Sequence, residues 1–257
     1  MGEETRAEPS SLKGPLADVF VEALLGGEVA PLLRRLGNRA KLTDPAEGRA
    51  LGLLQLEPAL THVRERVLAI HAKYERTRLT RGVDHDVAEG FLSFIHNGRS
   101  ERMPIATMVQ RGRAREVELR LYYTPKMMGH TGGRAQALEP VLDVFIPKPA
   151  RDFMAALADG RIDGALAMFE ASGKIVDASG TAHERANGAL NTALSKLAGG
   201  GFTMERTAGA DDGRACVIEG NLSQVGGAQV APHPALFVLQ RGDSGLWSEL
   251  RIYRDEG

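Results

Sequence analysis

The sequence predicts an α+β protein built from two similar halves, each with three N-terminal helices packed in a curved antiparallel sheet. One observation is a repeat: the segment from Phe20 to Asp44 returns between Phe153 and Asp177 with the same spacing between the aromatic residue and the aspartate. The other is element order. In each half, apolar residues at helical spacing come first, and short runs rich in β-branched and aromatic residues follow.

Further short motifs recur in the same order, which extends the repeat over most of the chain. They are Glu75-Arg76-Thr77 and Glu205-Arg206-Thr207, Glu89-Gly90 and Glu219-Gly220, Gln110-Arg111-Gly112 and Gln240-Arg241-Gly242, and Glu118-Leu119-Arg120 and Glu249-Leu250-Arg251. Two long copies indicate two domains rather than a solenoid of short repeats. We expect a flexible tail over residues 1–14, a first cone-shaped domain over 15–128, a linker over 129–138 and a second cone-shaped domain over 139–257.

In the first half, apolar residues at i, i+3 and i+4 spacing predict a helix that begins near Leu16 and stops at Gly26-Gly27. A second short helix is expected over 29–36 and a brief strand over 40–43, ended by the turn at Asp44-Pro45. We expect a third helix over 48–72, broken or bent near Pro58. Four strands are then expected over 74–80, 86–95, 103–112 and 115–123, with a hairpin turn over 110–113.

The second half repeats this plan. Helices are expected near 148–159, 161–171 and 181–198, and strands over 202–208, 214–224, 231–240 and 247–254. A sheet with helices on one side leaves an apolar outer face that a second copy can cover. We therefore expect the two sheets to pack together as a pseudo-dimer within one chain. A curved sheet wrapped on helices encloses an apolar pocket suited to a small molecule.

Composition excludes several classes of protein. The formal net charge of −1 favours neither nucleic acid nor an anionic membrane as partner. The single cysteine, Cys216, excludes an internal disulfide, and no apolar run approaches membrane-spanning length, so we expect a cytoplasmic protein. The seven histidines show no metal-binding spacing, and no glycine-rich phosphate loop precedes a helix. We expect neither a metal nor a cofactor.

Three segments of each half resemble a known superfamily. They are Phe20–Leu24, the Asp44–Gly48 turn and Val117–Tyr122 in the first half, and Phe153–Leu157, Asp177–Gly180 and Ser248–Tyr253 in the second. Each half resembles a cone-shaped domain of the nuclear transport factor 2-like superfamily, which includes ketosteroid isomerases, SnoaL-like polyketide cyclases and small epoxide hydrolases. The resemblance implies that Asp44 and Asp177 are catalytic general bases, in the role of the isomerase aspartate.

The same resemblance implies a ligand pocket lined by Phe20, Tyr74 and Ala106 in the first half and by Phe153 and Leu236 in the second. In the isomerases, two side chains at such positions donate hydrogen bonds to the developing oxyanion, whereas Phe20, Phe153, Ala106 and Leu236 carry no donor. Loss of one such donor typically costs roughly 3 to 4 kcal/mol of transition-state stabilisation.

Two functions therefore stay open. The first is a protein that binds a small apolar molecule and acts on it by proton abstraction, dehydration, ring closure or water activation, as an isomerase, cyclase, lyase or hydrolase with an aspartate as base. The second is a non-catalytic module of the same fold that binds a ligand or a protein. Asp44 before a proline is also what a plain turn prefers.

Overall fold

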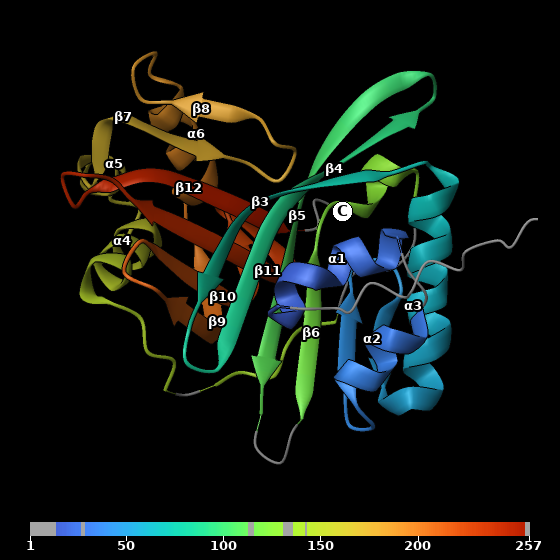
Figure 1. Cartoon of the computed structure of the whole chain (residues 1–257). Helices are drawn as coiled ribbons and strands as arrows, with labels where there is room; N and C mark the ends of the chain where they lie inside the picture. The colour runs from blue at the N-terminus through green and yellow to red at the C-terminus, as the bar shows by residue number, and fades with distance from the viewer. Residues whose placement is uncertain (1–13, 27–28, 113–115, 131–135, 142, 255–257) are drawn as a thin grey trace, which may run out of the picture.

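The computed structural model describes residues 14–26, 29–112, 116–130, 136–141 and 143–254. These residues form two halves with the same plan, each with three α-helices and one six-stranded sheet. The two sheets lie in the middle of the molecule and the helices lie on its two outer sides (Figure 1). The α+β fold class and the two similar halves are confirmed.

The first half begins with α1 (Leu16–Gly26) and α2 (Val29–Leu36), as the apolar spacing predicted. The remaining elements of this half are β1 (Lys41–Asp44), β2 (Gly48–Leu51), α3 (Gly52–Ala69), β3 (Lys73–Arg81), β4 (His85–His96), β5 (Arg99–Arg111), β6 (Val117–Tyr122) and the 3-10 helix η2 (Pro125–Met128). The strand order in its sheet is β2-β1-β6-β5-β4-β3.

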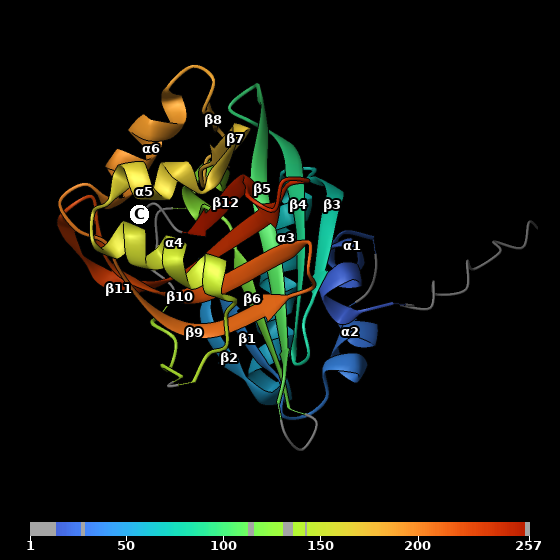
Figure 2. The ribbon, with the colours of Figure 1, turned by 90° about the vertical axis from the view of Figure 1, so that its left-hand side faces the viewer.

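The second half repeats this order as far as its last strand. Its elements are α4 (Lys148–Ala158), α5 (Ile162–Ala167), β7 (Phe169–Val176), β8 (Ala182–Glu184), α6 (Ala189–Ala198), β9 (Thr203–Asp211), β10 (Ala215–Val225), β11 (Ala228–Arg241) and β12 (Trp247–Arg254). The strand order is β8-β7-β12-β11-β10-β9, which matches the first sheet position by position. Figure 2 shows α4, α5 and α6 on the face of this sheet that is turned away from the first half.

Each sheet is mixed rather than purely antiparallel. The four long strands form antiparallel pairs as expected, but β1 pairs parallel with β6 and β7 pairs parallel with β12. The parallel pair arises because the early hairpin of each half, β1–β2 or β7–β8, docks beside the last strand of that half. This docking places the Asp44 turn at the edge of the first sheet.

Three expected helix boundaries are wrong. The helix expected over 48–72 is preceded by β2, because Gly48 at φ 83° closes a hairpin with β1 and Gly52 at φ 66° turns the chain into α3. The helix then continues through Pro58 without a break. In the second half, residues 169–171 and 182–184 belong to β7 and β8 instead of helices, since strand pairing in the sheet overrides local helical preference.

Other expectations fall partly outside the described residues. The tail over 1–14 is described only at Gly14, and residues 131–135 of the linker and 113–115 of the hairpin are not described. Of the expected hairpin turn over 110–113, Gln110 and Arg111 belong to β5.

Each half has its own apolar core between helices and sheet. The first core contains Phe20, Leu24, Leu60, Ile105 and Leu119, and the second is built around residues such as Phe153, Phe169, Leu194, Phe237 and Trp247. A third apolar cluster lies between the two sheets. Its members come from both halves: Val87, Ala106, Met108, Tyr122, Ala208, Ala210, Ala215, Val217, Leu236, Val238 and Tyr253. The outer faces of the two sheets therefore pack on each other.

Candidate functional site

Asp44 lies at the end of β1, in the tight turn that connects β1 to β2. Its carboxylate Oδ1 accepts hydrogen bonds from the backbone N–H groups of Ala46 and Glu47, both at 2.8 Å. This is the turn geometry that an aspartate before a proline favours. The turn carries Asp44 onto the inner face of the sheet, where its exposed fraction is 0%.

Two side chains from other elements complete the surroundings of Asp44. The Tyr123 hydroxyl, just after β6, lies 2.9 Å from Oδ2 and 3.0 Å from Oδ1. The Arg66 guanidinium, on α3, lies 3.4 Å from Oδ1 and donates to the Tyr123 hydroxyl at 2.9 Å and to Glu47 at 2.8 Å. Asp44 is therefore the acceptor at the centre of a buried cluster that joins β1, α3 and the end of β6.

Burial raises the pKa of Asp44 above 3.8, the ordinary value of an aspartic acid. Desolvation is the largest cause, and it outweighs the lowering by Arg66, by the Glu47 backbone N–H, by the Tyr123 hydroxyl and by the Ala46 N–H. A raised pKa is what a general base needs. A base must also have a lone pair directed at its substrate. The backbone N–H groups and Arg66 all bond Oδ1, so Oδ2, which among the described residues accepts from Tyr123 alone, is the oxygen left for that role.

The interior of the first cone holds a cavity of only about 20 Å³. Its walls are apolar side chains, among them Phe20, Leu92 and Leu121, together with Tyr123. Pockets for drug-sized ligands measure roughly 300 to 1,000 Å³. In this structure the first cone is filled by its own side chains.

Asp177, the second predicted base, has a different environment. It lies in the turn after β7, where its Oδ1 accepts hydrogen bonds from Ser179 and Thr181, and its Oδ2 lies 2.8 Å from Nε2 of His183. The side chain is 32% exposed. Partial burial opposes its ionisation, but the hydrogen bonds from Ser179 and His183 prevail and lower its pKa. Asp177 faces solvent, whereas Asp44 is enclosed.

The structure divides the predicted pocket residues into two groups. Phe20 and Phe153 are fully buried in the first and second cores, and Tyr74 packs half-buried against the first. Ala106 and Leu236 lie on the opposite face of their sheets, in the cluster between the two halves. Successive strand residues point to opposite faces, so the residue one position further along, Thr107 or Phe237, faces the cone instead. The placement of Ala106 and Leu236 in a cone pocket is corrected accordingly.

Thr107 is a residue that the sequence reasoning missed. It is 1% exposed, its neighbours Ile105 and Val109 belong to the first core, and its hydroxyl has no hydrogen-bond partner within the described part of the chain. Side chains alternate between the two faces of a strand, and this alternation was the signal in the sequence that Thr107, next to Ala106, could face the cone.

The repeated motifs of the sequence meet between the two sheets. Glu219 on β10 is fully buried and accepts from Arg120 at 2.7 Å, from Tyr122 and from Thr207 at 2.8 Å. Its counterpart in the first half accepts in the same manner: Glu89 is fully buried and accepts from Arg251 at 2.6 Å and from Tyr253 at 2.7 Å. Each half thus inserts one glutamate between an arginine and a tyrosine of the other half.

These ion pairs explain why the same short motifs occur twice. Glu89 and Glu219 come from the Glu-Gly repeats, and the arginines and tyrosines come from the repeated last strands, β6 and β12. Desolvation lowers the pKa of Arg120, but the carboxylate of Glu219 outweighs it and holds that pKa above the usual range. Two of the four repeated motifs, Glu-Gly and Glu-Leu-Arg, thus supply the buried ion pairs between the halves.

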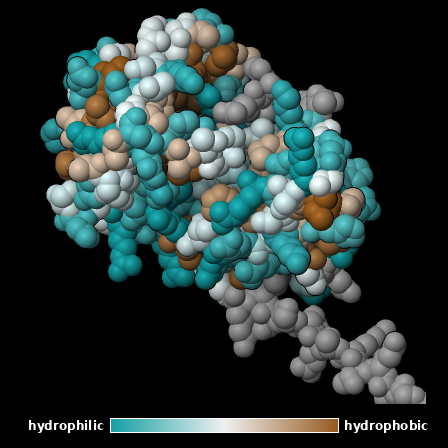
Figure 3. Space-filling view, turned by 90° about the horizontal axis from the view of Figure 1, so that it is seen from above, coloured by the Kyte–Doolittle hydropathy of each residue, from teal (hydrophilic) through white to brown (hydrophobic). Residues whose placement is uncertain are grey.

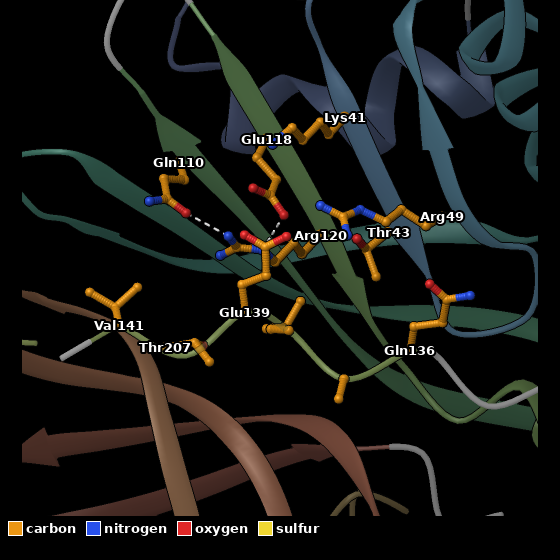
Figure 4. Close-up of a pocket in the computed structure, with 12 residues that line it drawn as sticks. Lys41, Thr43, Arg49, Gln110, Glu118, Arg120, Gln136, Glu139, Val141 and Thr207 are labelled. Atoms are coloured by element: carbon orange, nitrogen blue, oxygen red, sulfur yellow. Dashed lines mark hydrogen bonds and ion pairs between the residues drawn. The ribbon is translucent and has the colours of Figure 1, made fainter.

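A polar cleft of about 150 Å³ lies at one side of this contact (Figure 4). One wall is the outer face of β2, β1, β6 and β5, and the other is the segment 136–141 together with Thr207 of β9. The side chains on its sheet wall are Lys41, Thr43, Arg49, Gln110, Glu118 and Arg120. Gln110, Glu118, Arg120 and Thr207 form hydrogen bonds within the protein, whereas the Thr43 hydroxyl has no partner among the described residues.

Comparisons with known proteins give likenesses in fold. No family model matches the chain, and no curated protein matches it. One similar solved structure is an NTF2-like protein of unknown function from Cytophaga hutchinsonii, at 12% identity and a TM-score of 0.35, covering 44% of this chain and 93% of that one. Another, from Catenulispora acidiphila, is a hypothetical protein with a ketosteroid isomerase-like fold, at 17% identity and a TM-score of 0.36, covering 44% of this chain and 88% of that one.

A third similar structure is the epoxide hydrolase/cyclase-like enzyme SalBIII, at 14% identity and a TM-score of 0.37, covering 42% of this chain and 89% of that one. Each of these proteins corresponds in length to one half of this chain. They are of the kinds that the sequence resembles. At these identities and scores we carry over no activity from them.

Among the residues that the structure describes, no helix is long and apolar enough to cross a membrane. The same residues contain no group of three or more histidine, cysteine, aspartate or glutamate side chains arranged to hold a metal ion.

Proposed function

We propose that this chain is a non-catalytic binding protein made of two fused cone-shaped domains. The observation that carries the proposal is the enclosure of Asp44. Its carboxylate accepts from two backbone N–H groups, Tyr123 and Arg66, and the cone beside it holds only about 20 Å³. A carboxylate held in this way stabilises its turn, and the cone leaves no room beside it for a substrate.

The contact between the halves supports the fused arrangement. Each sheet covers the apolar outer face of the other, and the ion pairs of Glu89 and Glu219 are related by exchange of the two halves. Such reciprocity is the mark of a two-fold interface. We infer that the chain is an intramolecular pseudo-dimer, which leaves the surroundings of each copy free to diverge.

The test is a search for turnover. Wild-type protein and the Asp44→Asn variant are incubated with a cell extract of small metabolites, and mass spectrometry follows every compound. We expect neither protein to convert any compound. A product formed by the wild type and lost with Asp44→Asn, while the variant remains folded by circular dichroism, would establish Asp44 as a base and overturn the proposal.

Thr107 favours a second candidate, the binding of a small apolar molecule with one hydrogen-bond acceptor in the first cone. Its buried hydroxyl has no partner among the described residues and faces the apolar interior. The cone would have to widen well beyond its present cavity. Titration with the fluorescent probe 1-anilinonaphthalene-8-sulfonate, whose rings are apolar and whose sulfonate accepts hydrogen bonds, tests this: saturable binding by folded protein, weakened by Thr107→Val, supports the cone as a ligand site, and absence of binding excludes this candidate.

A further inference from the structure

We infer that the polar cleft between the sheets is a binding site for a small monocarboxylate. This inference rests on the proposed function, because it names the site and the ligand class of a binding protein. The cleft measures about 150 Å³, below the range of roughly 300 to 1,000 Å³ for drug-sized ligands. Its occupant is therefore a molecule of a few heavy atoms.

Strand alternation assembles the sheet wall. Lys41 and Thr43 alternate with the core residue Leu42 on β1, and Arg49 lies directly opposite Thr43 on β2. On the other side of β1, Glu118 is level with Lys41 and Arg120 with Thr43. These five side chains share the outer face because their neighbours Leu42, Ala50 and Leu119 fill the cone.

The Thr43 hydroxyl is the strongest indication of a ligand. Thr43 is 4% exposed and lines the cleft, and its Oγ1 has no hydrogen-bond partner within the described residues. A buried hydroxyl without a partner costs roughly 1 to 3 kcal/mol. Figure 4 shows Thr43 and Arg49 side by side on the same wall. A bound carboxylate oxygen would accept from this hydroxyl and remove that cost.

The charges of the cleft define the ligand class. Arg120 is paired with both Glu219 and Glu118, so these three groups together carry one negative charge and Arg120 has no charge left for a ligand. Lys41 and Arg49 form no ion pair within the part of the chain that the structure describes. Arg49 offers the planar donor pair that suits a carboxylate. Glu139 on the opposite wall adds a second negative charge, so Lys41 and Arg49 are balanced across the cleft and a ligand of more than one negative charge is disfavoured.

The opposite wall is held in place by a side chain of the second half. Asn221 is 3% exposed, and its amide accepts from the Leu138 N–H and donates to the Leu138 C=O, both at 2.8 Å. This pair of bonds fixes the segment 136–141 against β10. Asn221 is thus a positioning residue for the cleft, since it acts on the ligand only through the wall it holds.

The second half provides an internal comparison. There Val176 takes the place of Thr43 and Ala182 that of Arg49, as the matching registers of the two hairpins show. On that side Arg78 crosses between the halves, with Nη1 2.6 Å from Gln240 and Nη2 3.4 Å from Glu249.

Ala208 occupies the position in the second half that Arg78 occupies in the first, because Arg78 pairs with Glu89 and Ala208 pairs with Glu219. Arg78 thus closes the side of the interface that carries Val176 and Ala182. The side that carries Thr43 and Arg49 is left open, because the residue equivalent to Arg78 there is Ala208.

Calorimetric titration of the full chain with propionate, propionamide and ethylammonium tests the inference. We expect propionate to bind in the millimolar range and the other two compounds not to bind. Arg49→Gln should weaken propionate binding about tenfold or more, since it removes a charge-assisted hydrogen bond. Arg39→Gln removes the same charge from an exposed position outside the cleft and should leave the affinity unchanged.

Thr43→Val separates binding from folding. Valine has the shape of threonine and suits a strand, so the ligand-free variant should be at least as stable as the wild type, while propionate binds several-fold more weakly. Glu139→Gln should strengthen propionate binding. Absence of propionate binding, equal losses in Arg49→Gln and Arg39→Gln, or binding of ethylammonium instead would overturn the carboxylate site. Conversion of propionate by the protein would overturn the non-catalytic function and leave the site in place.

Discussion

At the scale of single residues, the same aspartate is open to a catalytic and a structural interpretation, and its donors decide between them. The Asp-Pro turn was predictable from the sequence because the turn chemistry is local. Arg66 and Tyr123, which lie 22 and 79 positions away, were not. No spacing in the sequence reports that α3 and the end of β6 converge on the β1–β2 turn.

The structural interpretation makes Asp44 important for stability. Asp44→Ala leaves the Tyr123 hydroxyl, the Arg66 guanidinium and two backbone N–H groups without their acceptor, so it should lower the free energy of unfolding by about 3 kcal/mol. Asp44→Asn keeps an acceptor oxygen and should cost about 1 kcal/mol or less at pH 7.

The pH dependence of stability tests the raised pKa of Asp44. Because the folded-state pKa of Asp44 is raised above 3.8, its titration favours the folded state below pH 3.8, and this contribution is lost as pH rises through the folded-state pKa. The amide that Asp44→Asn introduces does not titrate. Urea denaturation from pH 4 to pH 7 should therefore show the stability of the wild type falling relative to that of Asp44→Asn. A constant difference would contradict the raised pKa.

At the scale of elements, helix and strand order followed from the sequence and several boundaries did not. The long strands β4, β5, β10 and β11 were predictable because their β-branched and aromatic content is local. The short strands β2, β7 and β8 were not, since each exists through its pairing with another strand. The side of the sheet on which Ala106 lies depends on the strand register. An error of one residue in the register moves every side chain of the strand to the opposite face.

Strand packing also explains the glycine of each Glu-Gly motif. A Cβ on Gly220 would lie 2.4 Å from the carbonyl oxygen of Glu205 on the neighbouring strand, and a Cβ on Gly90 would lie 2.6 Å from that of Glu75. The neighbouring strand is displaced at both positions by a register shift.

Gly220→Ala should therefore lower the free energy of unfolding by about 2 kcal/mol or more, because the added methyl group must push β9 away from β10. Gly26→Ala is the matched control. A Cβ at that position meets no atom within 4 Å, and alanine is preferred over glycine in a helix, so its stability should be unchanged or higher. Thermal unfolding of the two variants checks the prediction, and a similar result for both would show that β9 and β10 can separate without cost.

At the scale of the whole molecule, the repeat in the sequence predicted two similar halves and did not reveal what the repeated residues do. Nothing in the sequence alone indicates that Glu89, Arg120, Glu219 and Arg251 are buried, since charged residues are mostly exposed. Their burial follows from the pairing of the sheets, in which each outer face becomes an interior. Figure 3 shows that apolar residues form only scattered patches on the face seen there. The apolar outer faces of the two sheets cover each other instead.

The buried ion pairs should make the two halves unfold together. Glu219→Gln removes the fully buried carboxylate partner of Arg120 and leaves Glu118 as its only ion pair within the described residues, so it should lower the free energy of unfolding by about 3 kcal/mol. Glu89→Gln should do the same to Arg251, which keeps Glu249. Glu75→Gln removes a charge from an exposed pair with Arg102 and should cost less than about 0.5 kcal/mol.

Calorimetry should show one transition for the wild type and for Glu75→Gln. In Glu219→Gln the weakened contact between the sheets should separate it into two, one for each half. A single transition in both variants, with equal midpoints, would mean that the apolar cluster alone couples the halves and that the ion pairs contribute nothing to it.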